Sequence, residues 1–271
     1  MIRKNLIYLL FISILTFSCK GKKEETTYSS REAREDQSIL HQYNHKNKEI
    51  KDPKATEIWD PEPEAVSFNE NNVPSDAIVL FDGSGLDAWT SAQDTTAAKW
   101  EVKDGVMTVV AGTGDIKTRQ KFGSVQLHLE WSAPDVVESE GQGRGNSGVF
   151  FQERYEVQIL DSYQNRTYAN GQAASVYKQH MPLVNATKAP DQWQTYDIIF
   201  HAPAFGADGK KTRSGTLTVF HNGVLVQDHV TVKGTTEYIG YPKNEAHGKG
   251  SIKLQDHGNP MQFRNIWVRE L

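Results

Sequence analysis

Residues 125–131 read Val-Gln-Leu-His-Leu-Glu-Trp, a strict alternation of apolar and polar side chains. Because successive side chains of a β-strand point to opposite faces, this period of two predicts a strand with one face in a core. The other face carries Gln126, His128 and Glu130. A strand that is apolar on one side only predicts a sheet packed against a second layer.

Short runs rich in β-branched and aromatic residues follow one another from residue 77 onward, without a long helical period between them. The clearest are residues 78–81, 106–110, 148–151, 155–160, 196–200, 217–220 and 266–268. Asp82-Gly83, Asp104-Gly105 and Asn222-Gly223 are dipeptides that supply positive φ in tight hairpin turns. About 195 residues of strands and turns therefore predict an all-β fold, a two-sheet antiparallel sandwich or jelly roll.

The charge balance and the cysteine content exclude two classes of site. The chain has 271 residues, with 30 Lys and Arg against 34 Asp and Glu, a formal net charge of −4. This argues against a nucleic-acid binder, which needs a concentrated basic face. Cys19 is the single cysteine of the sequence, so neither an intrachain disulfide nor a cysteine-based zinc site is available.

The first residues have the pattern of an export signal. Arg3 and Lys4 precede an apolar run, residues 6–17, that is too short to span a bilayer, which predicts a signal peptide over 1–18. Cys19 follows directly, and the junction resembles that of bacterial lipoproteins, in which this cysteine becomes the acylated N-terminus. The resemblance implies an extracytoplasmic protein, lipid-anchored in the outer membrane on its periplasmic or cell-surface side. The alternative is an ordinary secretory signal with an incidental cysteine.

Residues 19–76 are polar and carry no sustained apolar period. Such a stretch buries too little apolar surface to offset its ordering entropy, so residues 19–56 are expected to form a flexible linker. Ile58, Trp59, Val66 and Phe68 indicate an extended arm, residues 57–76, that docks on the domain. The globular domain is expected over residues 77–271.

Polar side chains also alternate with apolar ones in two later strands. In residues 155–160, Glu156 and Gln158 lie between apolar neighbours, and a strand at 252–255 directs Gln255 away from the core and leads into His257. If these strands neighbour 125–131, one open sheet face carries Glu130, His128, Glu156, Gln158, Gln255 and His257. We expect this face to form the floor of a groove.

Six segments in one order carry a resemblance to a known family. They are Gly-Asn-Ser-Gly-Val-Phe-Phe (145–151), Tyr-Glu-Val-Gln-Ile-Leu-Asp (155–161), Trp-Gln-Thr-Tyr-Asp (193–197), His-Asn-Gly-Val-Leu-Val (221–226), Leu-Gln-Asp-His-Gly (254–258) and Phe-Arg-Asn-Ile-Trp (263–267). Over residues 77–271 the chain resembles the 3-keto-disaccharide hydrolase family. This implies a sandwich of the concanavalin A-like lectin/glucanase type, acting on glycosides already oxidised at C3 of the sugar. An upstream sugar 3-dehydrogenase would supply that substrate.

The chemistry that the resemblance implies follows from the ketone. A ketone at C3 acidifies the hydrogen on C2, so a base can remove it and the enolate can expel the oxygen at C1; water then adds to the unsaturated sugar here or on a partner enzyme. Such a site needs one base, a stabiliser for the enolate oxygen and assistance to the leaving group. A divalent metal ion would serve as the stabiliser, with Glu156 and His257 as its ligands, and no other cofactor is implied.

The catalytic candidates are Glu156, His257, Gln158, Asp161 and Glu130. The alternative for Glu156 is a solvated outer-face glutamate, and for His257 a turn histidine that satisfies loop carbonyls. Asp256 is expected to fix the tautomer of His257. The candidates for substrate contacts are Gln255, Asp256, His128, Asn146, Tyr177, Lys178, Asn185 and Trp193. The glycine-rich residues 141–148 lack the Gly-Lys-Ser/Thr of a phosphate loop and indicate a mobile loop over the groove.

Two other functions remain open at this point. A conventional, glucanase-like glycoside hydrolase would use Glu130 and Glu156 as a facing acid and nucleophile or base. A non-catalytic glycan-binding lipoprotein would leave every oxidised substrate intact.

Overall fold

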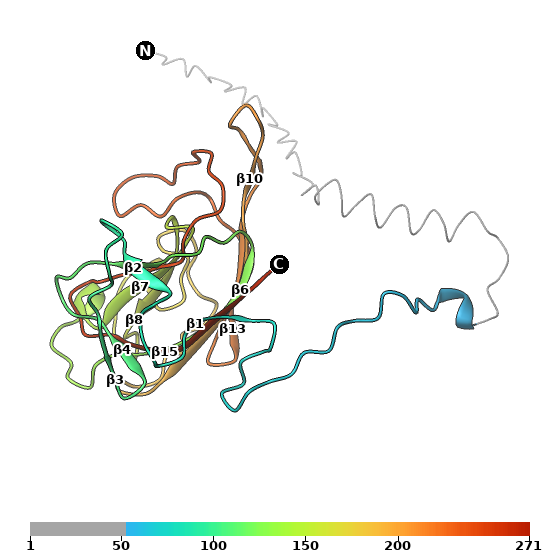
Figure 1. Cartoon of the computed structure of the whole chain (residues 1–271). Helices are drawn as coiled ribbons and strands as arrows, with labels where there is room; N and C mark the ends of the chain where they lie inside the picture. Colours follow the sequence, from blue (N-terminus) through green and yellow to red (C-terminus); the bar gives the residue numbers. More distant parts are fainter. Residues whose placement is uncertain (1–52) are drawn as a thin grey trace, which may run out of the picture. The chain divides into compact units, whose positions relative to one another are not determined.

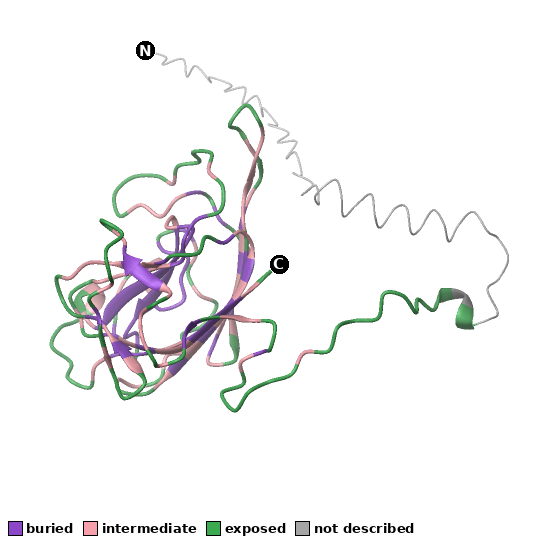
Figure 2. Cartoon of the chain, in the orientation of Figure 1, coloured by how far each residue is buried: buried purple, intermediate pink, exposed green. Residues whose placement is uncertain are grey.

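The computed structural model describes residues 53–271, which Figures 1 and 2 show in colour. Residues Glu64–Leu271 form one compact unit. The expected signal peptide 1–18, the acylation site Cys19 and the linker up to residue 52 lie outside the described residues. Among the described residues, no helix has the length and apolar character needed to cross a membrane.

The larger of two main sheets has eight antiparallel strands. They are β1 (Ile78–Phe81), β3 (Glu101–Lys103), β4 (Val106–Thr108), β6 (Val125–Ser132), β9 (Gln194–His201), β12 (Thr216–His221), β13 (Val224–Thr231) and β15 (Gln262–Glu270). Their order is β13-β12-β9-β6-β15-β4-β3, and β1 also pairs with β15. The strand with the alternating sequence, β6, therefore lies at the centre of this sheet, between β9 and β15.

The smaller main sheet has five antiparallel strands in the order β2-β5-β14-β7-β8. Their bounds are Trp89–Ser91 (β2), Ile116–Thr118 (β5), Lys253–Leu254 (β14), Asn146–Phe151 (β7) and Tyr155–Leu160 (β8). A separate ribbon, β10 (Ala204–Phe205) with β11 (Lys211–Arg213), projects from the sandwich (Figure 1). The helical turns of the described chain are short 3-10 segments: η1 (Pro53–Thr56), η2 (Gly141–Gly143) and η3 (Ala169–Gly171).

The two main sheets pack face to face around one core. Phe151 on β7 stacks against Phe200 on β9, with ring centroids 4.8 Å apart. The Tyr196 hydroxyl on β9 donates to the Gln158 carbonyl on β8 at 2.8 Å. The buried residues, purple in Figure 2, follow the strands of both sheets. The predicted two-sheet antiparallel sandwich is thus confirmed, with the apolar side of β6 inside it.

Two of the three predicted hairpin turns are confirmed. Asn222 and Gly223 have φ of 54° and 76° between β12 and β13, and Asp104-Gly105 joins β3 to β4 in the same way. The prediction for Asp82-Gly83 is wrong, because these residues connect β1 of the larger sheet to β2 of the smaller one. Gly83 still needs to be glycine, since its φ is +95° and a Cβ would lie 2.9 Å from the Gly105 Cα.

The expected docking arm, residues 57–76, overlaps the start of the compact unit. Residues from Glu64 onward belong to the compact unit, thirteen residues before the expected boundary at 77. Phe68 forms an isolated bridge with Pro74 and keeps 66% of its surface exposed. The docking of Ile58 and Trp59 stays a prediction.

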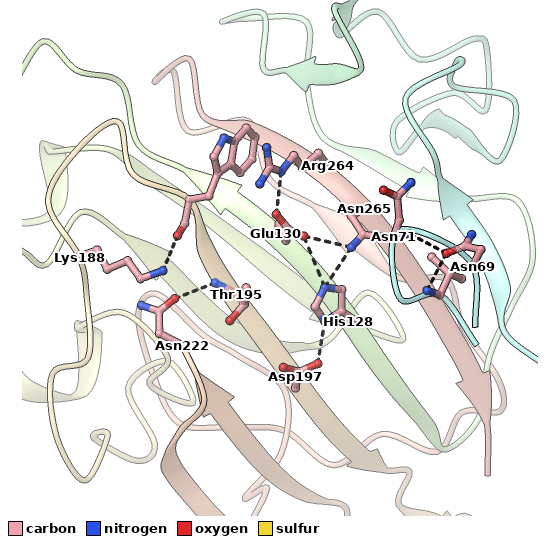
Figure 3. Close-up of polar contacts among 12 residues, drawn as sticks. Asn69, Asn71, His128, Glu130, Lys188, Thr195, Asp197, Asn222, Arg264 and Asn265 are labelled. Carbon is pink, nitrogen blue, oxygen red and sulfur yellow. Dashed lines mark hydrogen bonds and ion pairs between the residues drawn. The ribbon is translucent and has the colours of Figure 1, made fainter. Parts of the chain in front are cut away.

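The polar side of β6 lies on the outward face of the larger sheet, where it forms an ion-pair network (Figure 3). His128 Nδ1 lies 2.7 Å from Asp197 Oδ1, and its ring stacks on Trp267. Glu130 accepts hydrogen bonds from Arg264 Nε at 2.7 Å and from Asn265 Nδ2 at 3.0 Å. The expectation that His128 and Glu130 share a face with Glu156 is therefore wrong, because β6 pairs with β9 and β15 and belongs to the other sheet.

This network shifts the pKa values of both central groups. Burial alone would lower the pKa of His128, but its hydrogen bonds with Asp197 and Glu130 raise it to about 9. The hydrogen bond with His128, followed by those from Asn265 and Arg264, outweighs burial and lowers the pKa of Glu130 to about 2. Both residues are therefore charged at neutral pH and bind their partners in the sheet.

Replacing His128 by Gln should destabilise the fold in a pH-dependent manner. A histidine whose folded pKa is about 9 contributes stability in full below its unfolded value near 6.5, and loses it as pH rises through 9. We expect Tm at pH 6 to fall by roughly 5 °C, which corresponds to about 2 kcal/mol, and the difference from the natural protein to shrink by pH 10. Differential scanning calorimetry between pH 5 and 10 measures this.

The control is His201→Gln, which changes an exposed histidine at the end of β9 and should show no such trend. A Tm difference for His128→Gln that stays constant from pH 6 to pH 10 would contradict the ion-pair assignment.

Candidate active site

The outward face of the five-stranded sheet carries the other predicted residues. β7 and β8 pair so that Phe150 lies opposite Glu156, and Gly148 lies opposite Gln158. The intervening residues of both strands belong to the hydrophobic core, as the alternation in 155–160 predicts. Glu156 and Gln158 therefore lie side by side on the face that turns away from the larger sheet.

A cavity of about 580 Å³ lies over β7, β8 and the loop after β14; we call it the Glu156 cavity. It is lined by Gln142, Gly143, Asn146, Phe150, Glu156, Gln158, Tyr168, Tyr177, Lys178, Thr236, Tyr238, Gln255 and His257. Glu156, Gln158, Gln255 and His257 are the four residues expected to converge from distant parts of the sequence. The structure brings all four together.

Glu156 is buried in the floor of this cavity, with 4% of its surface exposed. Burial raises the pKa of its carboxyl group to about 8, the nearby charge of Lys253 lowers it, and that of Asp115 raises it. The Gln158 amide donates to Glu156 Oε1 at 3.0 Å when its nitrogen faces the carboxylate. The site therefore holds an acid that changes charge near neutral pH, which makes it a candidate for proton transfer.

Gly148 leaves the space that the Glu156 carboxylate occupies. A Cβ at Gly148 would lie 2.6 Å from Glu156 Oε1 and 3.0 Å from the Phe150 ring. Any side chain at this position would displace the carboxylate. The glycine of the segment Asn-Ser-Gly-Val thus has a direct role in the geometry of the site.

The loop after β14 is fixed to the sheet by its own hydrogen bonds. Gln255 N donates to Gly148 O at 3.1 Å, and Ser147 Oγ donates to Gln255 O at 2.7 Å. The Asp256 carboxylate accepts from the backbone N–H groups of Gly114 and Gly258. Asp256 therefore braces the loop, and the expectation that it fixes the tautomer of His257 is wrong.

His257 lies at the rim of the Glu156 cavity and is exposed to solvent. Its imidazole makes no hydrogen bond with any described residue, so both ring nitrogens are open to a ligand or to water. Its position, at the edge of the cavity and not on the floor, differs from that of Glu156. The two residues can therefore act on different parts of one bound molecule.

Two tyrosines and a lysine also line the cavity. The hydroxyls of Tyr168 and Tyr177 lie 2.5 Å apart, and Lys178 Nζ lies 4.3 Å from the centroid of the Tyr238 ring. Burial, and then the hydrogen bond with Tyr168, raises the pKa of the Tyr177 hydroxyl, so this phenol stays protonated and can donate. Aromatic faces and polar groups together suit a sugar ring, which presents both C–H surfaces and hydroxyls.

Several predicted site residues lie outside the cavity, where their partners hold them. Asp161 binds Arg144 Nε at 2.6 Å, and Asn185 Nδ2 donates to Ser162 O at 2.8 Å. Trp193 stacks under the Arg264 guanidinium at 4.0 Å, beside Glu130 on the larger sheet. The structure thus separates Asp161, Asn185, Trp193, His128, Glu130 and Asp256 from the lining of the cavity.

The glycine-rich segment forms the near rim of the cavity. It contains the short η2 and leads into β7, so no α-helix begins there, in agreement with the rejection of a phosphate loop. Gly141 N donates to Asn165 Oδ1, and Asn146 Nδ2 donates to Gln142 O. These bonds place Gln142 and Asn146 beside Gln158. The mobility of the loop stays a prediction.

Sequence reasoning did not identify Gln142, Phe150, Tyr168, Thr236 and Tyr238 as lining residues. The sequence could have indicated Phe150, because it lies two residues after Gly148 on β7 and therefore points to the same outward face. Tyr168, Thr236 and Tyr238 come from loops that have no periodic pattern, so no local signal points to them. Thr236 is placed by a hydrogen bond from the Glu156 backbone N–H to its hydroxyl at 3.0 Å.

A metal site is not evident from the side chains alone. Among the described residues, no three His, Cys, Asp or Glu side chains gather as a metal ion would require. Glu156 and His257 both line the cavity, so their expected role as metal ligands stays a prediction. We derive no step through a metal ion.

Comparisons with known proteins identify the family and the fold that this chain resembles. A protein of Bacteroides thetaiotaomicron named 3-keto-disaccharide hydrolase is 24% identical over 263 residues, which cover 76% of this chain and 83% of that protein. A crystal structure of a candidate glycosyl hydrolase from Parabacteroides distasonis is 49% identical, with a TM-score of 0.79, and the match covers 81% of this chain and 97% of that one. A second such structure from this organism, 18% identical with a TM-score of 0.53 over 72% of this chain and 94% of that one, shows the fold alone.

The family model that matches this chain covers nearly the whole sandwich. Residues 76–269 match the model of the 3-keto-alpha-glucoside-1,2-lyase-like domain. This range contains both main sheets except the last residue of β15, the Glu156 cavity and all six segments that carry the resemblance. The chain therefore belongs to the family of 3-keto-alpha-glucoside-1,2-lyase-like domains, as its sequence predicts.

Proposed function

We propose that this protein cleaves 3-keto-glycosides by removing the proton at C2 and expelling the group at C1. The observation that carries the proposal is a single buried carboxyl group, Glu156, whose pKa is raised to about 8 in a cavity with no second acid among its described lining residues. One base of this strength suits proton abstraction next to a ketone. The names of the family and of the relative from Bacteroides thetaiotaomicron support the substrate class.

In the first step Glu156, in its carboxylate form, takes the proton from C2. The electron pair of the broken C–H bond forms a C2–C3 double bond, and the charge moves to the oxygen at C3. Hydrogen-bond donors aimed at that oxygen lower the barrier. The Tyr177 hydroxyl and the Asn146 amide line the same cavity and are the donors available for this role.

In the second step the enolate collapses. The C3 carbonyl forms again, a double bond forms between C1 and C2, and the C1–oxygen bond breaks. His257, at the rim, gives a proton to the leaving oxygen, so that an alcohol departs. Addition of water at C1, with return of a proton to C2, completes net hydrolysis to the 3-keto-sugar.

The arrangement of acids disfavours a conventional glycosidase. Such enzymes place two carboxyl groups on opposite sides of the scissile bond, roughly 5–10 Å apart. Glu130, the expected partner of Glu156, lies in the other sheet, where it binds Arg264 and Asn265. A glycan-binding protein without activity needs no proton-transfer group, so the raised pKa of Glu156 favours an enzyme.

The substrate test compares a 3-keto-glucoside with its parent glucoside. We expect release of the aglycone from the oxidised compound only, because the parent has no acidic hydrogen at C2. Glu156→Gln should lose at least about 100-fold in kcat/KM, and His257→Ala about 10-fold or more. Liquid chromatography of the released alcohol measures both.

Thermal melting provides the control for folding. Glu156→Gln should melt at or above the temperature of the natural protein at pH 9, because it removes a buried charge. Equal cleavage of the oxidised and the parent glucoside, or full activity of both variants, would refute the proposed function.

Measured in the His257→Ala background, so that the proton donor at the rim does not contribute, the pH dependence of kcat/KM should report Glu156 as the base. Only its carboxylate accepts a proton, so activity should rise with pH through about 8. Lys253→Met removes a charge that lowers this pKa and should move the rising limb to higher pH, whereas Lys253→Arg should leave it near its original position. Activity that falls as pH rises through 8, or a rising limb that Lys253→Met does not move, would contradict the role of Glu156 as the base.

We also propose that the enzyme is exported and lipid-anchored at Cys19 in the outer membrane, where an upstream sugar 3-dehydrogenase supplies its oxidised substrate. The sequence at the end of residues 1–18 supports this. In a bacterial host, labelled palmitate should be incorporated into the natural protein and not into Cys19→Ala, and that variant should leave the membrane fraction. Equal labelling of both forms would exclude lipidation at this residue.

A further inference from the structure

A second cavity, of about 720 Å³, opens on the same outward face of the five-stranded sheet. It is lined by Ala92, Gln93, Gly112, Gly114, Asp115, Glu153, Lys253, Asp256 and Gly258. We call it the Asp115 cavity. It lies over β2, β5 and β14, whereas the Glu156 cavity lies over β7 and β8.

The two cavities are neighbours. Lys253 pairs with Phe150 across β14 and β7, and Phe150 pairs with Glu156 across β7 and β8. Lys253 Nζ lies 4.0 Å from the centroid of the Phe150 ring. Two strand spacings, roughly 10 Å, thus separate the Lys253 and Glu156 backbones, a distance that two linked sugar rings can span.

One loop forms the wall between the cavities. Gln255 and His257 line the Glu156 cavity, and the alternate residues Asp256 and Gly258 line the Asp115 cavity. A molecule that occupies both cavities must cross this loop near His257. The bond that is broken, and the oxygen that receives a proton, would then lie at the boundary.

The charged groups of the Asp115 cavity are already compensated. Lys253 Nζ binds Asp115 Oδ2 at 2.6 Å, and Lys117 Nζ binds Glu153 Oε2 at 3.0 Å. Asp256 accepts from two backbone N–H groups. A cavity whose charges are held in ion pairs or by backbone N–H groups favours a neutral ligand, and its many donors and acceptors favour one rich in hydroxyls.

The described lining of the Asp115 cavity also contains no aromatic residue, in contrast to the phenylalanine and three tyrosines of the Glu156 cavity. Gly112, Gly114 and Gly258 have positive φ, and they present backbone groups in place of side chains. An aromatic leaving group would find no ring to stack on here. Hydroxyl groups would find backbone and side-chain partners.

We propose that the Asp115 cavity is the subsite for the leaving group, and that it takes the second sugar of the 3-keto-disaccharide after which the relative from Bacteroides thetaiotaomicron is named. The inference rests on the proposed function, because it assigns the oxidised ring to the Glu156 cavity. Such a subsite makes a 3-keto-disaccharide a better substrate than the acidity of its leaving alcohol alone would predict. The binding energy of the second sugar is then available to the reaction.

The test uses two substrates that differ only in the leaving group, methyl 3-keto-glucoside and a 3-keto-disaccharide that releases glucose. Ala92→Phe places a ring in the Asp115 cavity, and Ala92 is not among the lining residues of the Glu156 cavity. We expect it to lower kcat/KM for the disaccharide at least tenfold and to change that for the methyl glycoside less than twofold. Gln93→Ala, a truncation of an exposed side chain, should act in the same direction if Ala92→Phe does not fold.

Val224→Phe makes a similar exposed change on β13 of the other sheet and should alter neither substrate. Equal losses on both substrates with an unchanged Tm, or full activity of Ala92→Phe and Gln93→Ala on the disaccharide, would overturn the subsite. If the natural protein cleaves neither oxidised substrate, the proposed function itself fails. If it cleaves the methyl glycoside but not the disaccharide, the failure belongs to the subsite alone.

Discussion

The burial of one carboxyl group on the outward face of the smaller sheet is the constraint on which the site depends. Glu156 is 4% exposed although it points away from the core, because loops that carry Tyr168, Tyr177 and Tyr238 cover that face. Burial costs the charged form stability and raises the pKa to about 8. The fold tolerates this cost, and the absence of a side chain at Gly148 leaves space for the Glu156 carboxylate. A strained electrostatic position of this kind is typical of a functional site.

The two sheets of the sandwich have different roles. The outward face of the larger sheet places its charges in compensated pairs, with His128 between Asp197 and Glu130 (Figure 3). The smaller sheet carries both cavities, and the loop after β14 is fixed to β7 by hydrogen bonds of Gln255 and Ser147. Asp256 and Asp115 brace the same loop from the other side. The rigid sheet thus supports residues that lie about a hundred positions apart in the sequence.

Alternation in residues 125–131 and 155–160 predicted the strands, their apolar faces and the two-sheet sandwich, because a period of two depends only on local geometry. It also placed Glu156 and Gln158 on an outward face. It could not say which sheet each strand joins, so His128 and Glu130 were placed with Glu156 when β6 in fact pairs with β9 and β15. Strand pairing between distant segments, and loops such as those of Tyr168 and Tyr238, carry no periodic signal. The roles of Asp161, Asn185 and Trp193 in ion pairs, hydrogen bonds and stacking likewise arise from long-range contacts.

The most direct measurement of the central claim follows the hydrogen at C2 when a 3-keto-glucoside is cleaved in D2O. Proton abstraction predicts either an unsaturated sugar that has lost the C2 hydrogen or a 3-keto-sugar with deuterium at C2 in the NMR spectrum. The Glu156→Gln variant should produce neither, and free 3-keto-sugar kept in D2O without enzyme corrects for spontaneous exchange. Cleavage by the natural protein that leaves the original hydrogen at C2 would contradict the account.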